Sequence, residues 1–293
     1  MNKKTIICIG AVLLILTGCN KDLGQMEAGS ITIEASIGQM TKVSYNGNAS
    51  SFTDGDTILL YAWTGSGSEV PATRVVDSVP NRFDGNTWIP SRDMRGKNTD
   101  ESHYFLSVYP VYANMTSFTA APYTLDTDNY TASDLLIATN LGGTKSTGAP
   151  VKLNFDHVMS KLNVNLKFRS QWNGTPAVSS VTVTAKSAAL VNYLTKSITA
   201  TGSASAVNIP AVSAVPDGYA LSYSGLQVPQ DSINRIAVTI DGKEYVYTSD
   251  THIPLASGKF TTLNLTVGKD SISLSSFAVT DWIADATLNA DIL

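Results

Sequence analysis

The side chains that most often carry out catalysis or bind metals are sparse in this sequence. Its three histidines are His103, His157 and His252, and no two of them have the short spacing of metal ligands. Aspartates stand two residues apart at 54/56 and 126/128, but neither pair begins a regular calcium-binding loop. No serine lies in a G-x-S-x-G nucleophile elbow. These residues predict no metal site, no cofactor site and no enzyme.

One residue near the N-terminus does indicate a chemical modification. Lys3 and Lys4 precede an apolar run from Ile6 to Leu16, which is too short to span a bilayer. The run ends in Leu16-Thr17-Gly18-Cys19, which resembles the bacterial signal that is cut before a cysteine whose new terminus is acylated. We therefore predict a lipid on Cys19. Several acyl chains on this residue would hold the protein stably on a membrane. The alternative is an ordinary secretory signal with an incidental cysteine.

Cysteine content and charge exclude further classes of protein. The only cysteines are Cys8, inside the signal, and Cys19, so the rest of the chain has no disulfide and no thiol nucleophile. The formal net charge is −4, and the sequence contains no run of basic residues. We expect no binding to nucleic acid, because neutralising phosphates requires clustered lysine and arginine.

From Ser30 onward the apolar residues recur at every second position, which is typical of β-strands. The clearest example is the stretch 161–169, where Leu162, Val164, Leu166 and Phe168 alternate with lysine, asparagine and arginine. A slip of one residue would carry charges into the core, so the register is tightly specified. No segment shows a sustained helical period. The sequence predicts an all-β protein built of β-sandwiches.

Shorter features complete the predicted strand pattern. The run 57–63 (TILLYAW) is mostly apolar and suits a buried strand. Asp84-Gly85-Asn86 and Asp241-Gly242 are turn signals between strands. Near the C-terminus the apolar phase changes between Ile272 and Val279, which predicts a bulge or kink at Ser275-Ser276.

Residues 140–150 (NLGGTKSTGAP) combine adjacent glycines, small polar residues and a proline, which are typical of a linker. We place a domain boundary there. The expected organisation is a signal peptide over 1–18, a polar tether over 19–29, an N-terminal β-sandwich over 30–149 and a C-terminal β-sandwich over 150–293.

Several motifs resemble those of the fimbrillin (type V pilin-like) family in order and spacing. They are 52–58 (FTDGDTI), 83–88 followed by Tyr104-Phe105 and Tyr109-Pro110, Asp134-Leu135-Leu136, 151–166 (VKLNFDHVMSKLNVNL), Gly258-Lys259-Phe260 and Thr280-Asp281-Trp282. No single motif is highly specific, but together they extend over nearly the whole chain after the signal. His157 lies in the F-x-H part of the fourth motif, where we expect a packed, hydrogen-bonded histidine.

The resemblance implies two tandem transthyretin-like β-sandwich domains on the surface of Bacteroidota-type bacteria. Members include shaft, anchor and tip subunits of type V pili and surface lipoproteins of undefined role. In polymerising members a surface protease removes the first strand, and the vacated groove accepts a C-terminal strand of another subunit. This is β-strand addition, in which the donor pairs with open backbone and fills apolar pockets. The implied partners are other pilin-like subunits, the outer membrane and a host or bacterial surface ligand.

Two segments of this chain match the parts that such assembly needs. The strand to be removed would be 30–37, in which Ile31, Ile33, Ala35 and Ile37 share one face. The donor-strand candidate is 286–293 (ATLNADIL), in which Ala286, Leu288, Ala290 and Ile292 share one face. The alternative is that this segment is simply the last strand of its own domain.

The cleavage site departs from the family pattern. The resemblance implies cleavage at an arginine, but the first arginine here is Arg74, beyond the second expected strand. Lys42 is the remaining candidate for strand release. An anchor, a tip or a non-polymerising lipoprotein therefore stays open beside a shaft subunit.

A second hypothesis is a glycan-binding surface lipoprotein of a nutrient-uptake system. Four tryptophans and 12 tyrosines are available for stacking against sugars, and Trp172, beside the turn Asn173-Gly174, is expected to be the most exposed tryptophan. Aromatic residues in β-proteins more often pack in cores or across strands.

Overall fold

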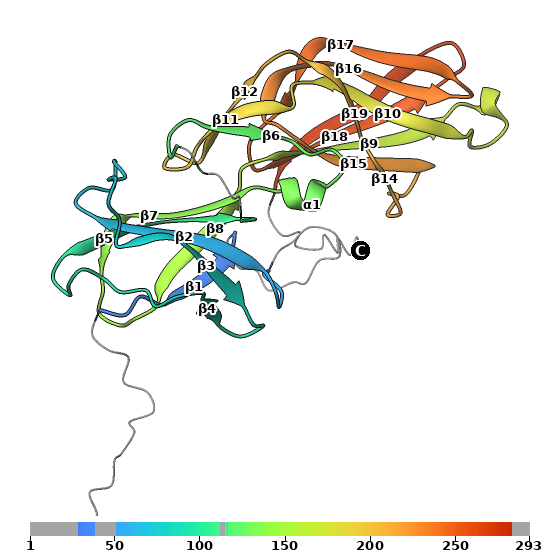
Figure 1. The fold of residues 1–293 in the computed structure, drawn as a ribbon. Coiled ribbons are helices and arrows are strands. Elements are labelled where there is room, and N and C mark those ends of the chain that lie inside the picture. The colour runs from blue at the N-terminus through green and yellow to red at the C-terminus, as the bar shows by residue number, and fades with distance from the viewer. Residues whose placement is uncertain (1–28, 39–50, 112–114, 116, 283–293) are drawn as a thin grey trace, which may run out of the picture.

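The computed structural model describes residues 29–38, 51–111, 115 and 117–282. A curled seven-stranded sheet forms the N-terminal body, with the order β1-β8-β7-β5-β2-β3-β4 (Figure 1). Its strands are β1 Ile33–Ile37, β2 Thr57–Thr64, β3 Val76–Phe83, β4 Trp88–Pro90, β5 Ser102–Tyr109, β7 Leu136–Lys145 and β8 Val151–His157. A bridge between Ser30 and Arg95 brings the two edges of this sheet together.

β2 is buried on both faces, as its apolar sequence predicts. Ile58, Leu60 and Ala62 point into the core that the curled sheet encloses. Leu59, Tyr61 and Trp63 point into a second core on the outer face of the same sheet. A three-stranded sheet of order β12-β11-β6 supplies the other side of that second core. Its strands are β6 Ala121–Thr124, β11 Ala188–Asn192 and β12 Ser197–Thr201.

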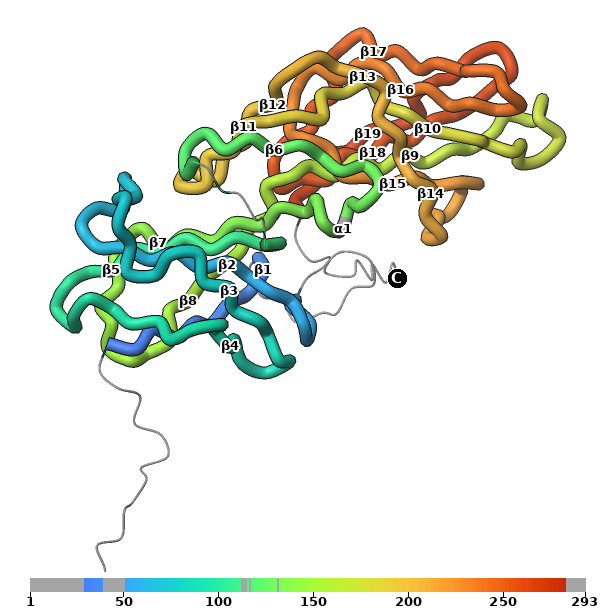
Figure 2. Tube along the Cα trace, viewed as in Figure 1, coloured from blue at the N-terminus to red at the C-terminus, as the bar shows by residue number. Residues whose placement is uncertain are grey.

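The C-terminal body is a β-sandwich (Figure 2). A four-stranded sheet of order β13-β10-β16-β17 faces a five-stranded sheet of order β14-β15-β9-β18-β19 across a continuous apolar core. The strands are β9 Ser160–Phe168, β10 Val178–Ala185, β13 Ser205–Asn208, β14 Ala211–Val212, β15 Leu221–Gln227, β16 Gln230–Ile240, β17 Lys243–Leu255, β18 Lys259–Val267 and β19 Ile272–Asp281. The all-β prediction and its sandwich architecture are confirmed.

In the part of the chain that the structure describes, helical structure is confined to two short turns. The α-helix α1 spans Tyr130–Ser133, and the Asn129 side chain caps it by accepting a hydrogen bond from the backbone N–H of Ala132. The 3₁₀ helix η1 spans Ser170–Trp172. Within the described ranges, no helix has the length and hydropathy needed to cross a membrane.

The register predicted for β9 is confirmed. Leu162, Val164 and Leu166 are fully buried in the sandwich core, while the intervening residues face the other side of the sheet. β9 pairs antiparallel with β15 and parallel with β18, so it lies inside the five-stranded sheet.

The turn and the bulge that the sequence predicts are also present. Asp241 and Gly242 join β16 to β17, and both have positive φ angles, 51° and 75°, as the tight hairpin turn requires. In β19 the residue Ser275 is extra, because Asn264 pairs with Ser276 whereas Leu265 pairs with Leu274. This bulge is the reason that the apolar phase of β19 changes along the strand.

The linker expected over 140–150 is wrong. The segment holds the end of β7 and the turn into β8, and these two strands pair antiparallel within the seven-stranded sheet. The strands of this sheet therefore run through His157, and the chain enters the C-terminal sandwich only at β9. The division at residue 150 does not match the division that the sheets make.

Candidate strand-exchange site

The first strand lies at an edge of the N-terminal sheet. β1 pairs in parallel with β8 from Ile33 opposite Val151 to Ile37 opposite Phe155, and β8 is its only sheet neighbour among the described strands. The backbone N–H of Val151 donates to the Thr32 carbonyl (2.8 Å). Because β1 pairs with a single strand, its release breaks one strand pair and the short contact that the preceding residues make with Met94 and Arg95.

The apolar face of β1 closes the core inside the curled sheet. Ile31, Ile33 and Ile37 are buried, with Ala35 partly buried beside them, whereas Glu34 on the other face is exposed. Each isoleucine contributes about 1.5–3 kcal/mol when fully buried. Removing β1 would therefore uncover both the backbone edge of β8 and a row of apolar pockets.

Each end of β1 is fixed by backbone hydrogen bonds. At the start, the Ile31 N–H donates to the Met94 carbonyl (2.9 Å), beside the bridge between Ser30 and Arg95. At the end, the Gly38 N–H donates to the Phe155 carbonyl (2.8 Å). The strand is thus held along its whole length.

An aromatic cluster lies next to the end of β8, and it accounts for Phe52 and Asp56 in the motif 52–58. Phe52 packs edge-on against Trp88 and Phe155, with ring centroids 4.9 and 5.3 Å apart. The Tyr109 hydroxyl donates to the Asp56 carboxylate (3.0 Å). Burial, together with the negative charge of Asp56, raises the pKa of Tyr109 to about 12.

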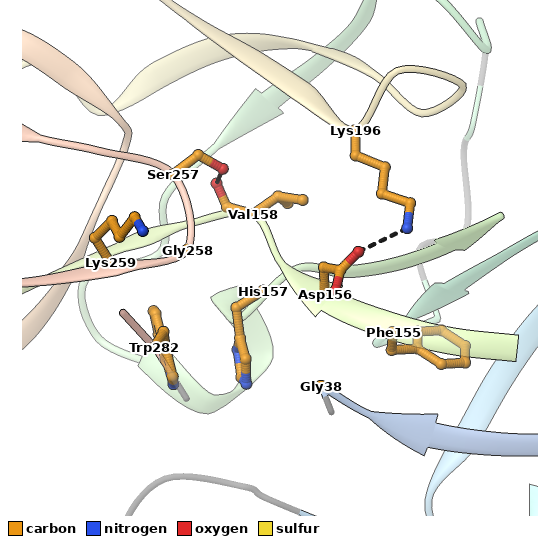
Figure 3. Close-up of a pocket in the computed structure, with 10 residues that line it drawn as sticks. All are labelled: Gly38, Phe155, Asp156, His157, Val158, Lys196, Ser257, Gly258, Lys259 and Trp282. Atoms are coloured by element: carbon orange, nitrogen blue, oxygen red, sulfur yellow. Dashed lines mark hydrogen bonds and ion pairs between the residues drawn. The ribbon is translucent and has the colours of Figure 1, made fainter. Parts of the chain in front are cut away.

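A pocket of about 340 Å³ lies where β1 ends and where the described C-terminus begins to leave the sandwich. Figure 3 shows Gly38, the residue after β1, on one side of this pocket, and Trp282, the residue after β19, on another. The remaining lining residues come from the end of β8 and the residue after it, the turn after β11, the turn after β17 and the start of β18. Lys196 and Asp156 form an ion pair there (2.7 Å). The pocket thus lies between the residue that follows β1 and Trp282, the last described residue before the donor-strand candidate in the sequence.

His157 organises this junction. Its ring stacks on the Trp282 indole with centroids 4.1 Å apart, and its Nδ1 lies 2.9 Å from the Asp134 carboxylate. The His157 side chain is 5% exposed. The expectation of a packed, hydrogen-bonded histidine is therefore confirmed.

Lys161 and Phe260 complete the surroundings of Trp282. The Lys161 ammonium lies 5.9 Å from the Trp282 ring centroid and 5.6 Å from that of Phe260. Burial lowers the pKa of Lys161, and the nearby Asp134 carboxylate opposes part of that shift. Trp282 is further fixed by its backbone N–H, which donates to the Gly258 carbonyl (2.8 Å).

The other predicted site residues lie outside the described part of the chain. These are the lipidation candidate Cys19, the cleavage candidate Lys42 and the donor-strand candidates Ala286, Leu288, Ala290 and Ile292. They stay predictions. No sequence pattern predicts a role for Asp134 beyond its place in the D-L-L motif, and none predicts that Gly38 and Trp282 line one pocket.

His103, weighed as a catalytic or metal-binding residue, and Trp172, weighed for glycan stacking, both have structural partners. His103 is buried, and its Nε2 accepts a hydrogen bond from the Lys97 N–H (2.9 Å). Trp172 is only partly exposed, packs against the sandwich core and donates through its indole N–H to the Val267 carbonyl (3.2 Å). No three His, Cys, Asp or Glu side chains of the described residues are grouped as metal ligands.

Comparison with known proteins connects this geometry to a family. A protein-family model described as fimbrillin-like matches residues 41–282. No curated protein sequence matches the chain.

Several crystal structures share the fold at low sequence identity. A protein from Bacteroides ovatus, named for an inferred role in cell adhesion, superposes with a TM-score of 0.67 at 17% identity, covering 89% of this chain and 100% of that one. A fimbrial protein from Bacteroides vulgatus gives 0.54 at 11% identity, with coverage of 86% and 99%. The tip fimbrial protein Mfa3 from Porphyromonas gingivalis gives 0.51 at 11% identity, with coverage of 78% and 95%. Because the family model matches most of the sequence, this chain belongs to the fimbrillin-like family.

Proposed function

We propose that this chain is a subunit of a surface fimbria, or an accessory adhesin of one, and that it joins other fimbrillin-like subunits by β-strand addition. The observation that carries the proposal is β1. It is an edge strand with one sheet neighbour among the described strands, and its isoleucines close the N-terminal core. The proposal assigns no chemical reaction to the chain, whose active parts are a groove and a strand.

The acceptor is the groove that β1 leaves. After its release, the β8 edge from Val151 to Phe155 offers unpaired N–H and C=O groups, and the enclosed core opens beside it. An extended donor satisfies both needs, because its backbone pairs with the edge while alternate side chains fill the pockets.

The donor is the segment 286–293 of another copy or of a related subunit. Its apolar residues Ala286, Leu288, Ala290 and Ile292 have the same spacing as Ile31, Ile33, Ala35 and Ile37 in the first strand. Four side chains at every second position match four vacated positions on one face. A donor in the correct register would therefore replace the first strand pocket by pocket.

The remaining parts of the proposal concern location and processing. An acylated Cys19 anchors the chain in the outer membrane at the cell surface, with residues 20–29 as its tether. Cleavage after Lys42 falls between β1 and β2, so it separates β1 from the rest of the domain. Other pilin-like subunits are the partners, and a surface ligand is the target of the adhesin.

Strand release and polymerisation can be tested together. The chain from Asn20 to Leu293 is treated with a lysine-specific protease and analysed on gels without boiling. We expect cleavage after Lys42 and a ladder of strand-exchanged oligomers. The Lys42→Gln variant should remain uncleaved between β1 and β2 and monomeric, whereas Lys97→Gln, an exposed matched control, should behave as the parent chain.

A truncated chain tests the donor strand independently of the cleavage. A chain that ends at Ala286 should still be cleaved after Lys42 but should give no ladder. A ladder formed without residues 287–293 would refute the assignment of the donor. A ladder formed by the Lys42→Gln variant would refute the assignment of the cleavage site.

A further inference from the structure

The last described strand leaves a row of apolar side chains uncovered. Leu274, Phe277 and Val279 in β19 are 40%, 47% and 39% exposed. They account for three of the eight large apolar side chains that are exposed in the described part of the chain. Their clustering on one strand marks a surface rather than scattered exposure.

This row faces the core side of its sheet. Residues directly opposite on paired strands share a face, and Leu274, Phe277 and Val279 pair with Leu265, Leu263 and Thr261 of β18, which are fully buried. The opposing four-stranded sheet ends at β17, which contacts both β18 and β19 but leaves Leu274, Phe277 and Val279 of β19 exposed. The row therefore extends the sandwich core beyond the area that the described strands cover.

The backbone edge of β19 is open as well. β18 is its only neighbour among the strands that the structure describes. Residues 271–280 contain no charged side chain, although charges are a usual protection of exposed edges against unwanted pairing. An uncharged edge with an apolar row has the features that favour pairing with another strand.

We propose that residues 286–293 of the same chain dock on this free edge of β19 and form a hairpin with it before assembly. The segment begins four residues after Trp282, where β19 has just ended, so a short loop suffices to reverse the chain. A tether this short raises the effective concentration of the segment at β19 far above that of a second copy in dilute solution.

The register of such a hairpin agrees with the apolar pattern. A two-residue loop at Ile283-Ala284, or a four-residue loop over 282–285, places Leu288 opposite Val279 and Ala290 opposite Phe277. Both pairs then lie on the core side, because directly opposite residues share a face. A three-residue loop would place Asn289 opposite Val279 and turn the apolar row outward. The two hairpin lengths that fit thus extend the core by one strand.

The start of the hairpin is held in place. Trp282 is fixed by its stacking on His157 and by its hydrogen bond to the Gly258 carbonyl, and Asp281 beside it forms an ion pair with Lys259. The docked segment is a resting state of the donor that the proposed function assigns, and on that point it rests on the proposed function. Its presence in the monomer does not depend on polymerisation.

A pair of cysteines tests the register directly. The chain from Asn20 onward contains every described residue and no cysteine, so introduced thiols are the only ones. Phe277→Cys combined with Ala290→Cys is exposed at low protein concentration to an oxidant or to a short bis-thiol crosslinker. We expect an internally crosslinked monomer that migrates faster on a non-reducing gel. The control, Phe277→Cys with Asn289→Cys, should give much less crosslink, because its thiols lie on opposite faces.

Other outcomes overturn the proposal. Crosslinked dimers without an internally crosslinked monomer would show that a second copy occupies β19. Equal crosslinking of the test and control pairs, or none of either, would show that the segment has no fixed place on the strand.

A second measurement does not need cysteines. A chain ending at Ala286 should bind more of a hydrophobic dye than the full chain, and adding Phe277→Ser should reverse the increase. An unchanged dye signal on truncation would also refute the docking. If the crosslinked monomer forms but the parent chain gives no ladder after cleavage at Lys42, the docking stands and the proposed assembly fails.

Discussion

The imidazole of His157 stacks on the indole of Trp282 with ring planes only 9° apart, although 125 positions separate these residues in the sequence. His157 closes the last strand of the N-terminal sheet, and Trp282 follows the last strand of the C-terminal sandwich. The contact therefore joins the two bodies at the last described residue, four positions before the donor-strand candidate in the sequence.

Replacing Trp282 with alanine should destabilise the whole chain. The change removes the stack on His157 and the contact with Phe260, and we expect a loss of about 1–3 kcal/mol in the free energy of unfolding. Denaturant unfolding followed by far-ultraviolet circular dichroism measures it. Trp282→Phe keeps an aromatic ring and should recover part of the loss. Equal stability of the alanine variant and the parent would contradict the role of this contact.

Weakening β1 should make its release easier. Ile33→Ala removes buried methyl groups from the core side of β1 and should lower stability by about 2–4 kcal/mol. We expect faster cleavage between β1 and β2 in a time course with a lysine-specific protease. Glu34→Ala on the exposed face of the same strand is the matched control and should leave the rate unchanged. The idea fails if both variants are cleaved at the parental rate.

Tyr109 should make stability fall at alkaline pH. Its pKa is raised to about 12 in the folded state, so above pH 10 the unfolded chain loses this proton first. The stability that Tyr109 contributes is fully present below pH 10 and is lost as the pH rises towards 12. Tyr109→Phe should be less stable than the parent at pH 8, because it loses the hydrogen bond to Asp56.

The difference in stability between the parent chain and the Tyr109→Phe variant should be smaller at pH 11 than at pH 8. Denaturation midpoints of the two chains at both pH values provide the comparison. Tyr130 and Tyr193 also have pKa values raised to about 12, so they too contribute to the loss of stability of the parent chain at alkaline pH. The Tyr109→Phe variant retains both residues, so the difference between the two chains reports on Tyr109. An equal stability difference at both pH values would show that deprotonation of Tyr109 is not coupled to unfolding.

Gly96 is a position where a side chain cannot be accommodated without movement. A Cβ there would lie 2.8 Å from the Ser146 Cβ and 3.1 Å from the His103 Nε2. Gly96→Ala should therefore cost about 1–3 kcal/mol of stability. Gly142→Ala is the matched control, because no neighbouring atom lies within 4 Å of its added Cβ. Thermal melting of both variants tests the difference, and equal melting temperatures would show that the packing at Gly96 yields freely.

Much of the fold could be predicted because period-two patterns specify register locally. The alternation of Leu162, Val164 and Leu166 with polar residues placed β9 correctly, and the change of phase in β19 located its bulge. Gly143 contributed to the wrong linker prediction, because glycine also occurs where two backbones approach closely. A Cβ at Gly143 would lie 3.0 Å from the Ser102 Cβ in the neighbouring strand β5, so this glycine serves strand packing.

The candidate site was predictable only in its separate parts. The alternation of Ile31, Ile33 and Ile37 identified a first strand with one apolar face, and that face is buried. Its parallel partner β8 is 118 positions away, and no local pattern encodes such pairing. The hydrogen bond between Asp134 and His157 and the stacking of His157 on Trp282 likewise arise from tertiary folding alone.

The three-stranded sheet would have a mechanical consequence in the filament that we propose. β6 comes from the N-terminal half of the sequence but pairs antiparallel with β11, so the chain passes between the two bodies three times before it continues into the sandwich. Tension applied along such a filament would be distributed over these connecting segments and over the hydrogen bonds between β6 and β11. It would not be carried by a single peptide linker. The subunit should extend as one stiff element under load, and its two halves should yield together.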